Sequence, residues 1–269
     1  GYAGNSFSPM LISDADFQRM VTFIKSNYGI DLSHKRKLIT GRLSPTIRKM
    51  GYSSFSDFVT HLLEKKDADE ITMILNKLTT NYTFFMREQE HLEYFRQRII
   101  PDLIRRHQRD KVLSIWSAGC SSGEEPYNIT MYLFDYLGTQ ARQWDTRILA
   151  TDISANALTS AKKGIYELPE TMPTDCTVRD EKSFEIKKLL KKDIQFKNQN
   201  LMEPEGIRKR YDLILCRNVM IYFDQPTKDA LVGRFYDATV PGGYLLISYS
   251  ENLSQNSPYH RLTTATFQK

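Results

Sequence analysis

Val112–Tyr127, with the sequence VLSIWSAGCSSGEEPY, decides the fold of this 269-residue chain. The stretch opens with a β-branched and apolar run that is typical of a buried strand, and a long helical pattern follows its acidic end. Gly119 and Gly123 lie between them, where residues without a Cβ let the backbone turn and come close to a ligand. The stretch therefore predicts a strand, a glycine turn and a helix that presents its first N–H groups.

The spacing of the two glycines limits the ligands that this turn can hold. It is Gly-x-x-x-Gly instead of Gly-x-Gly-x-x-Gly, and no Lys-Ser or Lys-Thr pair follows, so the dinucleotide fingerprint and the phosphate loop are both missing. Glu124 and Glu125 would repel a pyrophosphate but suit a ligand with hydroxyl groups and a positive charge, such as S-adenosylmethionine. An ordinary turn between strand and helix in an α/β domain is the alternative.

The composition is typical of a globular protein of one or two domains. No apolar run approaches the ~20 residues of a membrane span, and the start lacks the pattern of a signal peptide, so we expect a cytoplasmic protein. Cys120, Cys176 and Cys216 are odd in number and lack Cys-x-x-Cys spacing. They argue against a disulfide framework and against a zinc site, and we expect buried thiols and no metal.

The net charge of +5 lies entirely in the front part of the chain. Residues 1–111 contain 18 Lys and Arg against 13 Asp and Glu, and the remaining residues contain 19 of each. As a helix, the stretch after Ser33 would place Lys35, Arg42 and Lys49 in a row beside an apolar stripe. That stripe consists of Ile39, Leu43, Ile47 and Met50. We expect the row to dock an acidic partner surface, and a merely solvated helix face is the alternative.

An N-terminal helical domain is predicted for residues 8–88, and its helices end near Leu78. Ser13 caps a helix that runs to Tyr28 and ends at Gly29, and Ser54 and Asp69 begin two more.

The basic helix between them contains a proline. Pro45 lacks an N–H group and crowds the preceding turn, which predicts a kink, or a restart with Ser44 as the N-cap.

The stretch 79–88 breaks the helical pattern because it mixes small polar residues with aromatic ones. An exposed loop would not need the aromatic side chains, so we expect the stretch to pack against a second domain. Asn81, Thr83 and Arg87 would then supply polar groups to a cleft. A helix cap over a hydrophobic docking patch is the alternative.

Strands alternate with helices in residues 111–269, after a connecting helix within residues 89–110. This order predicts an α/β domain with a doubly wound, mostly parallel, Rossmann-like sheet, whose ligand lies at the carboxyl ends of the strands. The predicted elements are strands at Thr146–Thr151, Ile194–Lys197, Tyr211–Cys216 and Tyr244–Tyr249, helices at Ala155–Lys163 and Gln225–Thr239, and a turn at Pro241–Gly243.

Four strand ends carry residues that suit a ligand, namely Ser117–Gly119, Asp152, Asn200–Leu201 and Arg217–Asn218. A carboxylate at the position of Asp152 can accept hydrogen bonds from both hydroxyl groups of a ribose. The N-cap of the following helix is the alternative role for Asp152.

A small β-subdomain is predicted as an insertion at about residues 165–193. Cys176–Arg179 and Ser183–Lys187 alternate in polarity around a polar turn, which is typical of a hairpin. Insertions of this kind often carry recognition.

Four motifs resemble the CheR-type chemotaxis receptor methyltransferases. They are TTNYTFFMRE (79–88), WSAGCSSGEEPY (116–127), ATDI (150–153) and CRNVMIYF (216–223). The resemblance covers about Ser13 to the end, in the order of the family. It implies a helical N-terminal domain packed on an S-adenosylmethionine-dependent methyltransferase domain with a small β-subdomain.

The resemblance also implies the activity. The enzyme would transfer a methyl group from S-adenosylmethionine to glutamate carboxylates of chemotaxis receptors and leave S-adenosylhomocysteine. Attack would be in line, and the ionised carboxylate would need no general base. The five histidines lie outside the four strand ends, and we expect none to be catalytic. We expect a monomer that acts on the receptor's methylation helices and neither binds nucleic acid nor inserts into a membrane.

Residue by residue, the resemblance implies a complete site. Tyr222 and Arg87 would act near the methyl group, and Asp152 would hold the ribose. The other cofactor-binding residues would be Asn81, Thr83, Ala118, Gly119, Glu125, Asn200, Leu201, Arg217 and Asn218.

Two features bear on the substrate. The segment Glu167–Cys176 is shorter than the resemblance leads us to expect, and the hairpin turn lacks the extra glycine-bearing residues of family members that bind a receptor's C-terminal peptide. Both differences argue against such tethering here. Arg217–Met220 stands where an amino-group methyltransferase of nucleic acid usually has an Asn/Asp-Pro-Pro-Tyr/Phe run. A methyltransferase of nucleic acid or of a small molecule, and a non-catalytic module that senses the cofactor, are the alternatives.

Overall fold

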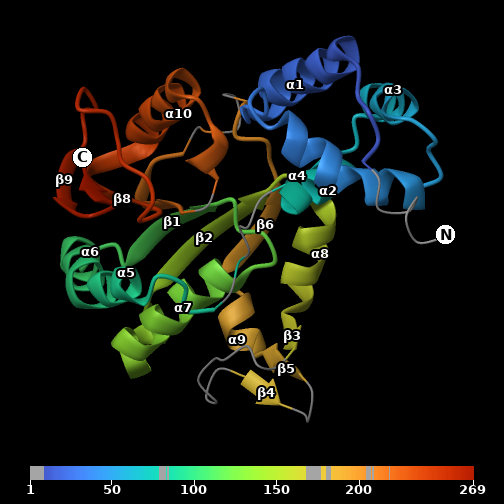
Figure 1. Ribbon diagram of the computed structural model, residues 1–269. Coiled ribbons are helices and arrows are strands. Elements are labelled where there is room, and N and C mark those ends of the chain that lie inside the picture. Colours follow the sequence, from blue (N-terminus) through green and yellow to red (C-terminus); the bar gives the residue numbers. More distant parts are fainter. Residues whose placement is uncertain are drawn as a thin grey trace. The chain divides into compact units, whose positions relative to one another are not determined.

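The computed structural model describes residues 9–78, 83, 85–167, 177–179, 183–203, 207, 209–217 and 219–269. The chain divides into two compact units (Figure 1). The first unit comprises Gly1–Tyr82 and Tyr222–Thr227, and the second comprises Thr83–Ile221 and Lys228–Lys269. In the described part of the chain, every helix is too short or too polar to cross a membrane.

The helices of the first unit are α1 (Asp14–Tyr28), α2 (Arg36–Lys49), α3 (Phe55–Lys65) and α4 (Ala68–Leu78). The predicted caps of α1 are confirmed, because the Ser13 hydroxyl accepts from the Asp16 N–H at 3.1 Å and Gly29 ends the helix at φ 77°. Ser54 caps α3 in the same way, at 3.2 Å from the Asp57 nitrogen. Buried apolar side chains from all four helices form one core.

Helix α2 runs without a break through Pro45, so the predicted restart at Ser44 is wrong. The Ser44 hydroxyl accepts from the Met10 N–H at 2.8 Å and donates to the Thr40 carbonyl one turn back, which keeps this residue helical. The predicted stripe is buried at Ile39, Leu43 and Ile47. Met50 is 39% exposed instead, because it lies beyond the last helical residue.

The second unit contains a seven-stranded sheet whose strands lie in the order β6-β2-β1-β7-β8-β10-β9. The strands from β6 to β8 are parallel neighbours, and β10 and β9 add to the β8 edge in antiparallel fashion. The bounds are β1 Val112–Ala118, β2 Asp145–Asp152, β6 Ile194–Asn198, β7 Tyr211–Cys216, β8 Thr239–Ile247, β9 His260–Thr263 and β10 Thr266–Gln268. The predicted mostly parallel, doubly wound sheet is confirmed.

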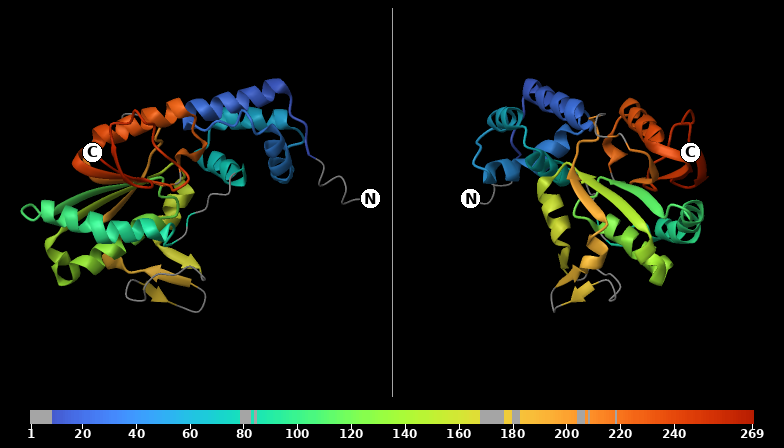
Figure 2. Two further views of the ribbon diagram at one scale, coloured as in Figure 1. Left: turned by 60° about the vertical axis from the view of Figure 1, so that its left-hand side comes forward. Right: turned by 180° about the vertical axis from the view of Figure 1, so that it is seen from behind.

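Helices cover both faces of this sheet, as Figures 1 and 2 show. On one face, α5, α6 and α7 pack against Leu113 and Ile115 of β1 in the largest core of the unit. On the other face, the ring of Phe235 in α10 packs against the ring of Trp116, with 5.3 Å between the two ring centroids. The bounds are α5 Gln89–Tyr94, a π-helix Phe95–Ile99, α6 Ile100–Arg106, α7 Glu124–Leu137, a 3-10 helix Gly138–Gln143, α8 Ala155–Lys163, α9 Lys188–Lys191 and α10 Gln225–Ala238.

Strand β8 begins earlier than predicted. The predicted turn at Pro241–Gly243 is wrong, because α10 gives way directly to β8 at Thr239. Residues 241–243 lie in a bulge of β8 instead. Tyr211 of β7 pairs with Thr239, and Leu213, only two residues later, pairs with Tyr244, so β8 has extra residues between the two pairs.

The inserted β-subdomain is a three-stranded antiparallel sheet in the order β3-β5-β4. Its strands are β3 (Ile165–Glu167), β4 (Thr177–Arg179) and β5 (Ser183–Ile186). The predicted β4–β5 hairpin is confirmed, and β3 is an addition to it. The hairpin turn and most of Glu167–Cys176, on which the argument against peptide tethering depends, lie outside the described residues.

Candidate functional site

The carboxyl ends of β6, β2, β1 and β7 lie at one edge of the sheet, called the carboxyl edge below. Ala118 pairs with Thr151, and Asp152 pairs with Asn198, so these parallel strands end side by side. Arg217 follows β7, the neighbour of β1 on its other side. Ligands of open parallel sheets bind outside such an edge.

The glycine turn leaves β1 in a compact loop. The N–H groups of Gly119 and Cys120 both donate to the Thr151 carbonyl at 2.9 Å. Gly119 has φ 78°, and a Cβ on it would lie 2.2 Å from Cγ2 of Val219. The glycine is therefore required for the close approach of the loop after β7. Our prediction had assigned that close approach to a ligand.

A buried ion pair lies behind this turn. Glu125, in the first turn of α7, accepts from Nε of Arg217 at 2.7 Å and from the Ser117 hydroxyl at 2.7 Å. The side chains of Arg217 and Glu125 are 3% and 10% exposed. Arg217 also donates from Nη1 to the Arg87 carbonyl at 3.1 Å, so one guanidinium joins β7, α7 and the segment that carries Arg87.

Glu124 faces protein groups as well. It is 3% exposed and accepts from the Ser122 hydroxyl at 2.9 Å. Both acidic side chains at the helix start are thus held by donors of this chain. Glu125 was predicted to attract a positively charged ligand. In the structure, Arg217 provides the positive charge beside it.

The backbone around Arg87 is strained. Met86 and Glu88 have φ 62° and 52°, values that non-glycine residues rarely adopt. The Met86 N–H donates to Oδ1 of Asn128 at 2.9 Å, which together with the Arg217 contact holds the segment in place. Strain of this kind, held by surrounding contacts, is typical of functional segments.

Glu88 belongs to the same network, and the sequence predicted no role for this residue. Burial opposes its ionisation, but His91, the Tyr249 N–H at 3.2 Å and the charge of Arg217 together hold the pKa of Glu88 below its usual value. Its position as the last residue of TTNYTFFMRE was the one signal for it.

Asp152 is the last residue of β2 and is half-buried. Its carboxylate accepts from the Ser121 N–H at 3.4 Å and from the Ser154 N–H at 3.2 Å. Ser154 is the N-cap of α8, with its hydroxyl 3.0 Å from the Ala157 nitrogen. The alternative role of Asp152 as that N-cap is therefore wrong, and its carboxylate is oriented at the carboxyl edge.

The remaining residues of the predicted pocket follow β6 or β7, or precede α5. Oδ1 of Asn200 accepts from the Met202 N–H at 3.0 Å. Leu201 is buried, and its carbonyl accepts from Arg234 of α10 at 2.9 Å. Thr83 is half-buried. Asn81 and Asn218 lie outside the described residues.

Tyr222 and the basic row belong to the first unit. Lys35 is the residue before α2, and its Nζ lies 5.7 Å from the centroid of the Tyr222 ring. Arg42 and Lys49 are exposed on α2, and Arg42 donates to the Lys77 carbonyl at 3.4 Å. Arg42 and Lys49 keep the predicted spacing on α2, whereas Lys35 lies outside the helix that was predicted to carry it.

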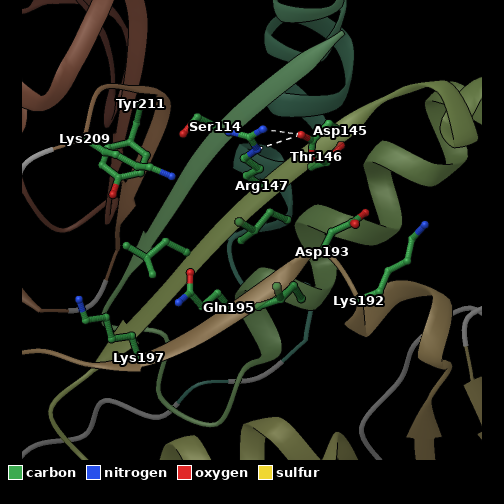
Figure 3. A pocket seen from close by; sticks show the side chains of 13 residues that line it. Ser114, Asp145, Thr146, Arg147, Lys192, Asp193, Gln195, Lys197, Lys209 and Tyr211 are labelled. Atoms are coloured by element: carbon green, nitrogen blue, oxygen red, sulfur yellow. Dashed lines mark hydrogen bonds and ion pairs between the residues drawn. The ribbon is translucent and has the colours of Figure 1, made fainter.

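A hollow of about 560 Å³ lies elsewhere on the second unit, along β2 and β6 (Figure 3). Its lining includes Arg147, Lys197 and Lys209, and Arg147 is paired with Asp145 at 2.7 Å. None of its lining residues is among those predicted to bind the cofactor. The hollow therefore does not belong to the carboxyl-edge site.

Two of the three cysteines lie at this edge of the sheet. Cys120 and Cys216 are free and buried, and burial raises the pKa of both well above the ordinary value. Buried thiols are confirmed for these two residues, and Cys176 lies outside the described residues.

The carboxyl edge brings together an acidic strand end and a glycine turn that leads into a helix. Asp152 lies at the strand end where an acidic residue holds the ribose in nucleotide-binding sheets of this kind, and the turn before α7 lacks the sequence of a phosphate loop. A Rossmann-like sheet that ends in an acidic residue at this position defines a class of nucleotide-binding α/β domains.

Comparisons with known proteins identify the family of this chain. The family model "CheR methyltransferase, SAM binding domain" matches residues 81–268, and "CheR methyltransferase, all-alpha domain" matches residues 15–79. The chain belongs to the CheR methyltransferase family.

Three relatives carry related names. The chain is 36% identical to a chemotaxis protein methyltransferase of Borreliella burgdorferi, over 96% of this chain and 95% of the relative. It is 35% identical to a chemotaxis protein methyltransferase of Escherichia coli, over 91% and 87%. It is 31% identical to chemotaxis protein methyltransferase 1 of Pseudomonas aeruginosa, over 93% and 94%.

Proposed function

We propose that this chain transfers the methyl group of S-adenosylmethionine to glutamate side-chain carboxylates of chemotaxis receptors, in the cytoplasm and as a monomer. The observation that carries this proposal is the carboxyl edge, where Asp152 ends β2 and the buried Arg217–Glu125 pair lies just beyond β7, the two strands that flank β1. The family and the names of the relatives support the substrate class.

The cofactor would lie along this edge. Asp152 would accept from the ribose hydroxyl groups, while Asn200 and Leu201 would contact the adenine. The methionine end would lie against the glycine turn and the segment that Arg217 holds. Asn81, Thr83 and Arg87 would line the methionine end, with Glu125 nearby. Ala118 and Gly119 would also bind the cofactor, and Arg217 and Asn218 would complete the pocket.

When bound, the cofactor supplies a methyl group on a positively charged sulfur. The chain's residues then have three tasks, which are to align the receptor carboxylate, to exclude water and to leave the carboxylate ionised. A glutamate has a pKa near 4.3 and is ionised at neutral pH, so no residue has to remove a proton. Arg87 would orient the incoming carboxylate and Tyr222 would lie beside the methyl group, which makes alignment the main contribution.

Receptor docking would depend on the basic row. Lys35, Arg42 and Lys49 would attract the acidic methylation helices of a receptor, because α2 carries no acidic residue that would offset them. Exposed charges act mainly on the rate of encounter and are screened over ~8 Å at physiological salt.

A filter assay with radiolabelled S-adenosylmethionine tests the proposal. The chain is incubated with receptor cytoplasmic fragments, with nucleic acid, or alone. Label on receptor protein only supports the proposal. Label on nucleic acid assigns the enzyme to another substrate class, and cofactor binding without transfer in any arm indicates a sensing module.

A further inference from the structure

The segment Tyr222–Thr227 packs with the first unit, although the residues on both sides of it in the sequence belong to the second. We call it the Tyr222 segment. Its neighbours in the first unit are residues near the end of α1 and before α2. They lie almost 200 positions earlier in the sequence.

The end of α1 shapes the contact with the backbone of the Tyr222 segment. Gly29 turns the chain with φ 77°, and Ile30 then forms an antiparallel bridge with Phe223. Next to it, the Asp31 N–H donates to the Tyr222 carbonyl at 3.0 Å. The carboxylate of Asp31 accepts from the Ser33 N–H at 2.9 Å, which fixes the loop that carries the donating N–H group. The backbone of Tyr222 is thereby held by hydrogen bonding from α1's end.

An ion pair holds the other end of the segment. Nζ of Lys25, in the last turn of α1, lies 2.8 Å from Oδ2 of Asp224. Oδ1 of the same carboxylate accepts from the Thr227 N–H at 2.9 Å, where α10 begins. The hydrogen bond from Lys25, aided by those from Thr227, lowers the pKa of Asp224 to about 2. The pair therefore stays charged throughout the pH range of an enzyme assay.

The ring of Tyr222 has a cation beside it. Nζ of Lys35 lies 5.7 Å from the ring centroid, within the range of a cation–π contact. Lys25, Asp31 and Lys35 thus contact the charge, the backbone and the ring of one short segment.

We propose that Lys25 and Asp224 position Tyr222 for methyl transfer, so that the helical unit contributes to turnover as well as to docking. This inference rests on the proposed role of Tyr222 in the reaction. Lys25 and Asp224 are positioning residues, because their contacts are with the segment and no contact with substrate is needed for this role.

The expected effect is modest but specific. Lys25 and Asp224 have side chains that are 47% and 25% exposed, and exposed ion pairs contribute little energy. We expect Lys25→Met to lower kcat by about two- to five-fold, with cofactor affinity unchanged. Asp224→Asn should have a similar effect, because asparagine keeps the acceptor for Thr227 and removes only the charge. Lys25→Arg should restore most of the rate.

The experiment measures kcat at saturating receptor fragment and the affinity for S-adenosylhomocysteine. Arg19→Met is the matched control, because it removes an ion pair of the same helix, Arg19–Asp16 at 3.1 Å, that does not contact the Tyr222 segment. Each of Lys25→Met and Arg19→Met is also combined with Tyr222→Phe. The proposal expects the Lys25→Met loss to vanish in the Tyr222→Phe background and Arg19→Met to be without effect.

Three results would overturn the inference. The first is a Lys25→Met variant whose kcat equals that of the parent. The second is an Arg19→Met control that loses as much kcat as Lys25→Met does. An undiminished Lys25→Met loss in the Tyr222→Phe background shows that Lys25 does not act through Tyr222. Failure of the proposed function looks different, since Tyr222→Phe would then keep the parent's kcat, or the parent would not methylate the receptor.

Discussion

Glu125→Gln tests the electrostatic core of the site. Glutamine keeps the shape of the side chain and can still accept from the Ser117 hydroxyl. It replaces the charged oxygen that faces Nε of Arg217 at 2.7 Å with a neutral group. The guanidinium, whose side chain is 3% exposed, is then left buried without its counter-charge.

The magnitude follows from this burial. Removing one partner of a buried ion pair costs about 3–5 kcal/mol. Arg217 keeps its bond to the Arg87 carbonyl at 3.1 Å, which places the expected loss of unfolding free energy near about 3 kcal/mol. For a unit of this size, that loss lowers Tm by roughly 6–12 °C. Arg217→Met alone leaves the carboxylate buried and should cost a similar amount.

Calorimetric unfolding of the intact chain provides the assay. Asp145→Asn is the control, because it breaks an ion pair of the same 2.7 Å length whose side chains are 57% and 53% exposed. It should cost no more than about 1 kcal/mol. The double variant Glu125→Gln/Arg217→Met should be more stable than the sum of its parts by about 1–3 kcal/mol. Additive losses, or a Glu125→Gln curve that matches Asp145→Asn, would refute the reasoning.

Three further predictions concern the function. Asp152→Ala should weaken S-adenosylhomocysteine binding by about 1.5–3 kcal/mol in calorimetric titration, because it deletes the ribose acceptors. Asp145→Ala, at the other end of β2, should bind like the parent, and equal affinity of the two would remove the ribose assignment. Arg87→Ala and Tyr222→Phe should lower kcat more than cofactor affinity in steady-state assays. Arg105→Ala, an exposed arginine of α6, is the control, and weakened cofactor binding at unchanged kcat would make Arg87 and Tyr222 pocket walls. Arg42→Glu/Lys49→Glu, which spares Lys35, should raise the KM for receptor and flatten the salt dependence of the rate, while Lys162→Glu/Lys163→Glu on α8 should not. A parent rate indifferent to salt would contradict the docking proposal.

The periodic parts of the fold could be predicted from the sequence. Ser13, Gly29 and Ser54 mark helix ends by local hydrogen bonding, and the buried strand β7 matches its prediction residue for residue. The predictions that were wrong concern residues whose conformation depends on contacts with residues far away in the sequence. Pro45 stays inside α2 because Ser44 is fixed by Met10, 34 residues earlier.

The strand ends of the candidate site were also visible in the sequence, because carboxyl ends of parallel strands must meet. The pairing of Glu125 with Arg217, 92 residues apart, was not visible, since only the register of β1 and β7 brings them together. The role of Glu88 and the place of Tyr222 in the first unit depend on contacts of the same long range.

The base lability of the transferred methyl group tests the central claim most directly. The parent enzyme, radiolabelled S-adenosylmethionine and a receptor cytoplasmic fragment are incubated, and the labelled protein is then treated with mild base. A methyl ester of glutamate hydrolyses to the carboxylate and methanol, so the proposed function predicts release of the label as volatile methanol and its location on glutamates in peptide maps. Label that resists base, as a methyl group on nitrogen would, contradicts the claim.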